Sequence, residues 1–192
     1  MRIRVLPIVR IAAVLCLGAA LSACVSGVRS SGARAGAMTP ALSPGAVITE
    51  TSPLHDAVQI GRVTGGSTTN AMGKSQVSNE TFRTALEQAL VLHTMAADDR
   101  PRFILSAELI SLAQPSVGVN ATVTASVHYR LQAVGSERVV MDDVIATPYT
   151  ATIGDAIIGV ERLRLANEGA MRENISTVMQ KLVSISGTLP TS

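Results

Sequence analysis

The stretch that decides the fold is ATVTASVHYRLQA, residues 121–133. Apolar side chains occupy every odd position of this stretch, and polar side chains occupy every even position. Because successive side chains of a strand point to opposite sides, the alternation predicts a strand with one buried face and one wet face. Such a strand is typical of an antiparallel sheet that is covered on one side only.

The neighbouring segments continue this pattern. Gly135 and Ser136 predict a turn directly after the strand 121–133, since both residues favour turn geometry. Pro148 predicts a break or an edge position in the strand that follows, because proline has no N–H for a hydrogen-bond ladder. The predicted strands cover residues 57–65, 103–112, 121–133 and 138–152.

Two segments change to a period of 3.6 residues and predict helices. Residues 78–95 form an amphipathic helix that begins after Ser78, a favourable N-cap. Residues 160–184 form a longer one. Asn167 and Asn174 lie on the inner stripe of the longer helix, either as buried groups that specify one packing or at the margin of the stripe. We favour the margin.

The order of these elements predicts the fold class. A sheet with one apolar face and two amphipathic helices packs most simply as two layers. We therefore predict an α+β two-layer sandwich, with a four-stranded, mainly antiparallel sheet and two helices on one face, in the order β-α-β-β-β-α. This single domain is expected to span residues 54–192, which is enough chain to bury a hydrophobic core.

The start of the chain carries an export pattern. Arg2, Arg4 and Arg10 precede an uncharged apolar run over 11–20, which closes on LSAC, residues 21–24. This run is about half as long as the roughly 20 residues that a membrane-spanning helix needs, so it predicts a cleaved signal. The closing tetrapeptide resembles the lipobox of bacterial lipoproteins, in which the cysteine is acylated.

The lipobox resemblance has consequences for the mature chain. It implies that residues 1–23 are removed as a signal peptide and that Cys24 carries a thioether-linked diacylglycerol and an N-acyl group such as palmitate, a permanent anchor. Val25 stands where the sorting rule of these lipoproteins places aspartate for retention, which implies the outer membrane, with the domain facing the periplasm. Residues 24–53 are rich in Ser, Gly, Ala and Pro. We predict that they form a flexible tether.

Loss of the signal changes the charge balance. Three of the 16 basic residues precede Cys24, which leaves 13 basic against 14 acidic residues and a net charge of −1. The chain also has only two Tyr, two Phe and no Trp that could stack on bases. We therefore predict no nucleic-acid partner.

The residues that carry chemistry do not form a catalytic pattern. His55, His93 and His128 are far apart in the sequence and lack the spacing of metal ligands. Asp142 and Asp143 are adjacent in a predicted strand and so point to opposite faces. The sequence has neither a nucleophile elbow nor a phosphate-binding loop. We predict a protein that is not an enzyme, with no catalytic residue, no metal site and no cofactor.

The whole pattern is similar to that of known small envelope lipoproteins. The likeness rests on the lipobox, the helix 78–95 after a first strand, the strand 103–112, and the closing helix with Asn167 and Asn174. In these features the chain resembles the YajG-type and LptE-like lipoproteins of bacteria. The resemblance implies an accessory of envelope assembly or transport, and no functional residue is carried over from it.

These patterns lead to one main functional hypothesis and one alternative. The main hypothesis is a non-enzymatic outer-membrane lipoprotein that is anchored in lipid through Cys24 and acts by contact with an envelope protein. The alternative is binding of a lipid or small apolar ligand in a cavity between helices and sheet, where small residues either leave space or permit close packing. These small residues are Ala85, Ala89, Ala107, Ala121, Ala125 and Ala170.

The apolar segment 149–159 is a further candidate for function. It is interrupted by Gly154, Asp155 and Gly159. Such a segment is either a loop that docks on the core, which we favour, or an exposed apolar patch for a partner.

Overall fold

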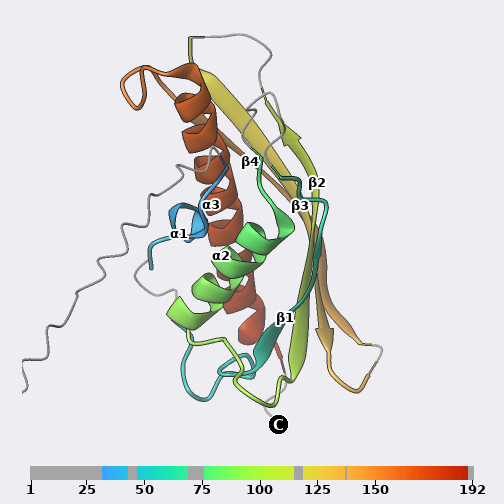
Figure 1. Ribbon diagram of the computed structural model, residues 1–192. Helices are drawn as coiled ribbons and strands as arrows, with labels where there is room; N and C mark the ends of the chain where they lie inside the picture. Colours follow the sequence, from blue (N-terminus) through green and yellow to red (C-terminus); the bar gives the residue numbers. More distant parts are fainter. Residues whose placement is uncertain (1–31, 43–46, 69–75, 115–118, 137, 190–192) are drawn as a thin grey trace, which may run out of the picture.

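The protein consists of one layer of four strands and one layer of helices (Figure 1). The computed structural model describes residues 32–42, 47–68, 76–114, 119–136 and 138–189. The predicted α+β class is confirmed, and the four strands and two long helices occur in the predicted order. The strands are β1 Val58–Thr64, β2 Phe103–Ala113, β3 Ala121–Ala133 and β4 Val139–Ala151, and the helices are α1 Ala35–Met38, α2 Asn79–Leu92 and α3 Gly159–Ser186.

The sheet has the strand order β1-β2-β3-β4 and is mainly antiparallel, as predicted. β1 pairs with β2 in parallel, because α2 carries the chain from the end of one strand back to the start of the next. β4 is an edge strand, and it keeps Pro148 within the ladder opposite Thr124. An edge strand tolerates proline because one side of its backbone has no strand to bond.

Helix α2 begins where the sequence predicts and ends three residues earlier than Met95. The Ser78 hydroxyl accepts a hydrogen bond from the backbone N–H of Thr81 at 3.1 Å and so caps the helix. At the other end, the Nδ1–H of His93 donates to the carbonyl of Ala89 at 2.7 Å. Thr94 then adopts a φ of 56°, which turns the chain out of the helix.

Helix α3 runs along the sheet over β3 and β4, with α2 beside it on the β1 side (Figure 1). Its 28 residues correspond to a length of about 42 Å. Asn174 is fully buried, and its Nδ2 donates to the carbonyls of Ala125 on β3 and Ile145 on β4, at 3.2 and 2.9 Å. Asn167 is equally buried and accepts a hydrogen bond from Gln114. The prediction that both asparagines lie at the margin of the stripe is therefore wrong.

Close approach of α3 to β4 depends on Gly169. A Cβ at this position would lie 2.2 Å from Cδ1 of Tyr149, so the aromatic ring occupies the space that any other residue would need. Arg172, one turn further along α3, places its guanidinium 5.5 Å from the centre of the same ring. The ring of Tyr149 on β4 therefore lies against Gly169 and beside the guanidinium of Arg172.

The core lies between the helices and the inner face of the sheet. Its largest buried side chain, Tyr129, meets Phe82 of α2 edge to face at a centroid distance of 6.4 Å. Burial raises the pKa of the Tyr129 phenol far above its ordinary value. All six small residues singled out in the sequence are buried within this layer, where they permit close packing of helix on sheet.

The segment before β1 differs from its prediction. A flexible tether over 24–53 is wrong for the described residues 32–42 and 47–53, which pack on the domain. Met38 of α1 is fully buried, Ile48 is nearly so, and α1 lies against α2 and α3. The average composition of this segment is that of a linker, but a few well-spaced apolar side chains, Met38 and Ile48 among them, pack it on the domain.

We predict that Gly169→Ala lowers the free energy of unfolding by about 2 kcal/mol, because the added methyl group displaces Tyr149. Gly36→Ala is the matched control, since a Cβ at this helical glycine meets nothing within 4 Å. Alanine favours helix over glycine, so the control is expected to be neutral or more stable by up to about 1 kcal/mol. Urea unfolding of both variants measures the difference, and equal stabilities would contradict the close packing described here.

Candidate functional site

The predicted acylation site, Cys24, lies outside the described residues. The structure therefore bears on it only through the part of the chain that follows, from Gly32 onward. No helix within the described ranges is both long enough and apolar enough to cross a bilayer.

The chain is fixed to the domain by an ion pair between Arg34 and Glu168. Glu168 is 2% exposed and lies on α3, and its carboxylate accepts three hydrogen bonds from Arg34. They come from the backbone N–H, from Nε and from Nη2, at 3.0, 2.9 and 3.0 Å. The hydrogen bond and the charge of Glu168 raise the pKa of Arg34 above its ordinary value. A buried carboxylate needs such partners, so the pair holds residue 34 at one place on α3.

The packed segment also has a direction along α3. Arg172 donates to the carbonyl of Ala37 at 3.2 Å, whereas Arg34 binds Glu168 one turn closer to the start of the helix. Traced backward from Ala37 to Arg34, the chain thus moves toward the N-terminal end of α3. This is also the end at which the loop between β4 and α3 lies (Figure 1).

The exposure of the side chains in this loop distinguishes between the two interpretations of segment 149–159. Tyr149 packs on α3, but Ile157 is 87% exposed and Ile158 is 65% exposed. Ile153 is also exposed, as is Val160 in the first turn of α3. The favoured prediction of a loop docked on the core is therefore wrong, and the segment presents apolar side chains to the solvent.

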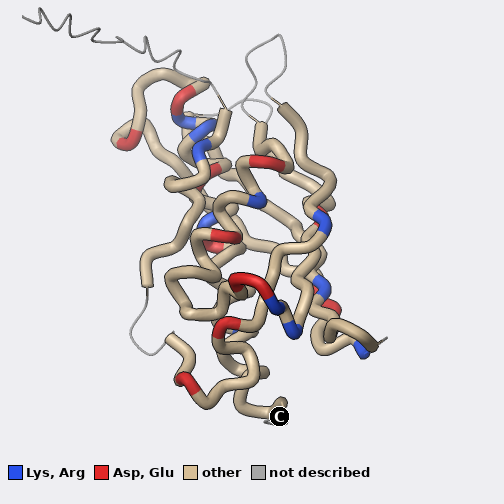
Figure 2. Tube along the Cα trace, turned by 60° about the horizontal axis from the view of Figure 1, so that its bottom comes forward, with Lys and Arg blue, Asp and Glu red and all other residues tan. Residues whose placement is uncertain are grey.

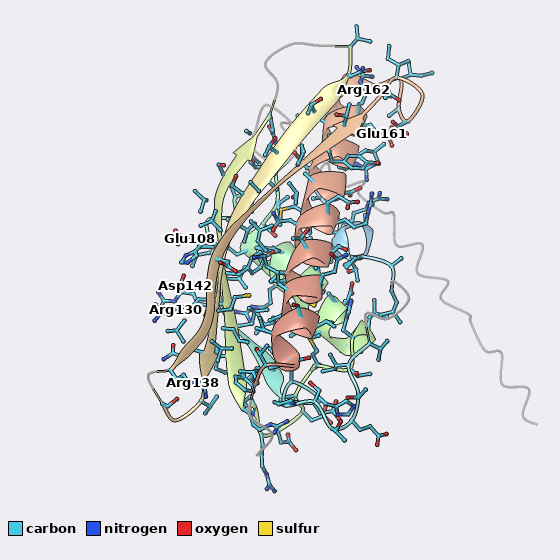
Figure 3. All side chains as sticks on the ribbon, turned by 180° about the vertical axis from the view of Figure 1, so that it is seen from behind. Glu108, Arg130, Arg138, Asp142, Glu161 and Arg162 are labelled. Atoms are coloured by element: carbon cyan, nitrogen blue, oxygen red, sulfur yellow. The ribbon has the colours of Figure 1, made fainter. Side chains whose placement is uncertain are left out.

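The outer face of the sheet is exposed and polar, as the alternation in β3 predicts. Glu108, Arg130 and Asp142 project from β2, β3 and β4 on the side opposite to the helices (Figure 3). His128 bonds to the Asp142 carboxylate through Nε2, and a shallow hollow of about 250 Å³ lies beside it. Asp143 points the other way and pairs with Lys181 of α3 at 2.9 Å. The two aspartates therefore separate as predicted.

The charges on this face do not form a single-sign patch. Figure 2 shows basic and acidic residues interspersed along the described chain.

Among the described residues no group of three or more His, Cys, Asp or Glu side chains is placed to hold a metal ion. The His128 ring is bonded to a carboxylate and to no hydroxyl group of the described chain.

A second hollow lies at the helix layer. It is a groove of about 640 Å³ between the segment that follows α1 and the exposed side of α2. Pro40 and Ala41 line one wall, and Val91 and Leu92 line the other. This groove could accept an apolar ligand, but it lies on the outer side of α2 and not between the helices and the sheet, where the sequence predicts the ligand cavity.

Sequence patterns did not single out the pair of Arg34 and Glu168. The available signal was weak: Arg34 is the only charged residue between Ser30 and Thr49. Its partner is 134 residues away, and the helical pattern of α3 gave Glu168 no distinction from the other charged residues of the helix.

Comparison with known proteins identifies the fold. No family model matches the chain, and no curated protein matches its sequence. Protein XCC0632 of Xanthomonas campestris, a DUF330 protein, has a similar structure, with a TM-score of 0.56 and 8% identity over 74% of this chain and 92% of that one. A putative lipoprotein of Caulobacter crescentus matches with a TM-score of 0.50 and 14% identity, over 70% of this chain and 94% of its own. Identities this low establish a common fold only.

We predict that Glu168→Gln lowers the free energy of unfolding by about 2 kcal/mol, because Arg34 loses its charged partner and a buried amide replaces the carboxylate. Glu161→Gln is the matched control. Glu161 also lies on α3 and pairs with Arg164, but its side chain is 48% exposed, so a change within about 0.5 kcal/mol is expected. Urea unfolding distinguishes the two, and a neutral Glu168→Gln would show that the segment is not fixed by this pair.

Proposed function

We propose that the chain is a bacterial outer-membrane lipoprotein that is acylated at Cys24 and acts without catalysis, as an accessory that contacts an envelope protein. The observation that carries the proposal is the LSAC tetrapeptide after a basic start and a short apolar run. The fold supports it, because the similar structure from Caulobacter crescentus is described as a putative lipoprotein. The likeness to YajG-type and LptE-like lipoproteins belongs to this proposal.

The surface proposed for the protein contact is the outer face of the sheet. The opposite face is covered by α2 and α3, whereas this face is open and crosses β2, β3 and β4 (Figure 3). It combines charged groups of both signs with the exposed apolar side chains Ile110 and Val144. Such a mixture is typical of surfaces that form polar, separable protein contacts.

The anchor has a direct test in the two cysteines. Cys24→Ala is expected to abolish incorporation of labelled palmitate and to leave the precursor uncleaved, because the acylated sulfur is lost. Cys16→Ala is the matched control, since Cys16 lies in the apolar run of the signal, and it should be processed and acylated normally. Mass spectrometry of the native protein should show a chain that begins at acylated Cys24. Membrane fractionation should recover this chain with the outer membrane. An intact N-terminus with a free thiol would contradict the proposal.

The protein contact is tested by a photo-crosslinking amino acid at Val144, on the outer face of the sheet. Val91, an equally exposed valine on α2, is the control position. We expect a reproducible envelope protein to be captured from Val144 and not from Val91. If no such protein is captured in repeated preparations from intact membranes, the accessory function is wrong even where the anchor is right.

The groove beside α2 supports one alternative function, the binding of a lipid or another small apolar ligand. Its volume lies in the range of ligand sites, and Val91 and Leu92 give it an apolar wall. Native mass spectrometry of the delipidated protein tests this alternative. A bound species that is lost in Val91→Glu would support it, and an unoccupied wild-type protein would count against it.

A further inference from the structure

Five exposed aliphatic side chains gather at one end of the domain. Ala121 of β3 pairs with Ala151 of β4, so the residues just before β3 and just after β4 lie at the same end of the sheet. The residues before β3 contribute one of these side chains, and the loop into α3 and the first turn of that helix contribute the others. We name this set the apolar tip: Val119, Ile153, Ile157, Ile158 and Val160, each between 49% and 87% exposed.

The backbone of the tip is held in one shape. Asp155 accepts hydrogen bonds from the N–H and the hydroxyl of Thr152 at 2.7 and 2.8 Å, and the backbone hydrogen bond in particular lowers the pKa of Asp155. Arg162, 9% exposed, donates to the carbonyls of Ala156 and Ile157 at 2.6 and 2.9 Å. A buried arginine therefore braces the loop, whereas Ile157 and Ile158 in the same segment are exposed. Exposed apolar groups on a braced loop are typical of a contact surface.

The first described residues that follow Cys24 in the sequence lie near this tip. Arg34 and Asp155 line the same small cavity of about 200 Å³, between the packed segment and the loop. Traced backward, the segment moves along α3 toward the tip, as described above. Gly32 follows Cys24 by eight positions, and a chain of that length spans at most about 29 Å.

The tip chemistry fits the hydrocarbon boundary of a bilayer. All five side chains are β-branched and aliphatic, and none carries a hydrogen-bonding group. Glu161 and Arg162 lie where α3 begins (Figure 3), and Asp155 lies in the loop itself, where its carboxylate accepts hydrogen bonds from Thr152. Aliphatic side chains beside charged groups fit the membrane interface, where apolar groups enter the acyl region and charged groups stay among the lipid headgroups.

We propose that the apolar tip inserts into the same bilayer that holds the acylated Cys24, so that the domain stands on the membrane with α3 directed away from it. This inference rests on the proposed lipid anchor. The occupant of the tip is the lipid surface, because the short connection from Cys24 brings this end of the domain closest to the bilayer.

The test uses the native acylated protein, reconstituted into vesicles of phosphatidylethanolamine and phosphatidylglycerol. Ile157→Cys provides a single free thiol for an environment-sensitive fluorophore, because Cys16 is lost with the signal and Cys24 is acylated. Val144→Cys is the matched control at another exposed apolar position, on the outer face of the sheet, and Ser136→Cys marks the β3–β4 turn at the opposite end. Nitroxide-bearing lipids and aqueous iodide serve as the two quenchers.

The account predicts that lipid nitroxide quenches the label at residue 157 at least about twofold more than the labels at 144 and 136, with reduced access for iodide. Equal quenching at all three positions in an acylated protein would overturn the inference and leave the anchor intact. A label at 157 that is shielded from both quenchers would mean that protein covers the tip, which also overturns it. An absence of acyl chains in the mass spectrum would remove the proposed function and the inference together.

Discussion

The position of α3 on the sheet is the constraint on which the rest of the structure depends. Asn174 bonds to both β3 and β4, so it fixes the helix over the boundary between these strands. Gly169 lets the helix approach Tyr149 closely at a second point. Because these contacts set both the rotation and the height of α3, they determine where its charged residues lie.

A single consequence of that position links the fold to the proposed function. Glu168 is buried where it faces Arg34, and the ion pair draws the N-terminal segment onto α3. The segment then runs toward the end of the helix at which the apolar tip is exposed. The same helix that closes the core thus orients the chain that leads to the proposed anchor. One end of the domain then lies near the proposed membrane, and the open face of the sheet stays available to the proposed partner.

The elements of this fold could be predicted from local patterns, whereas its long-range polar contacts could not. Alternation in β3, the Ser78 cap and the turn at Gly135 are each encoded within a few residues, and the structure confirms them. The pairing of Arg34 with Glu168 spans 134 positions and leaves no periodic signal. The burial of Asn174 depends on carbonyls of two strands that the helical pattern does not contain. The exposure of the tip depends on the space that remains after Tyr149 and α3 have packed.

The central claim is that the segment from residue 33 to residue 39 is folded on α3 and is not part of a loose linker. Amide hydrogen exchange of the full-length protein tests it most directly, because Arg34, Met38 and Thr39 donate backbone hydrogen bonds within this segment or to Glu168. The account predicts that these amides exchange far more slowly than those of an unfolded chain. Exchange at the rate of an unfolded chain would contradict it, and with it the orientation of the domain toward the membrane.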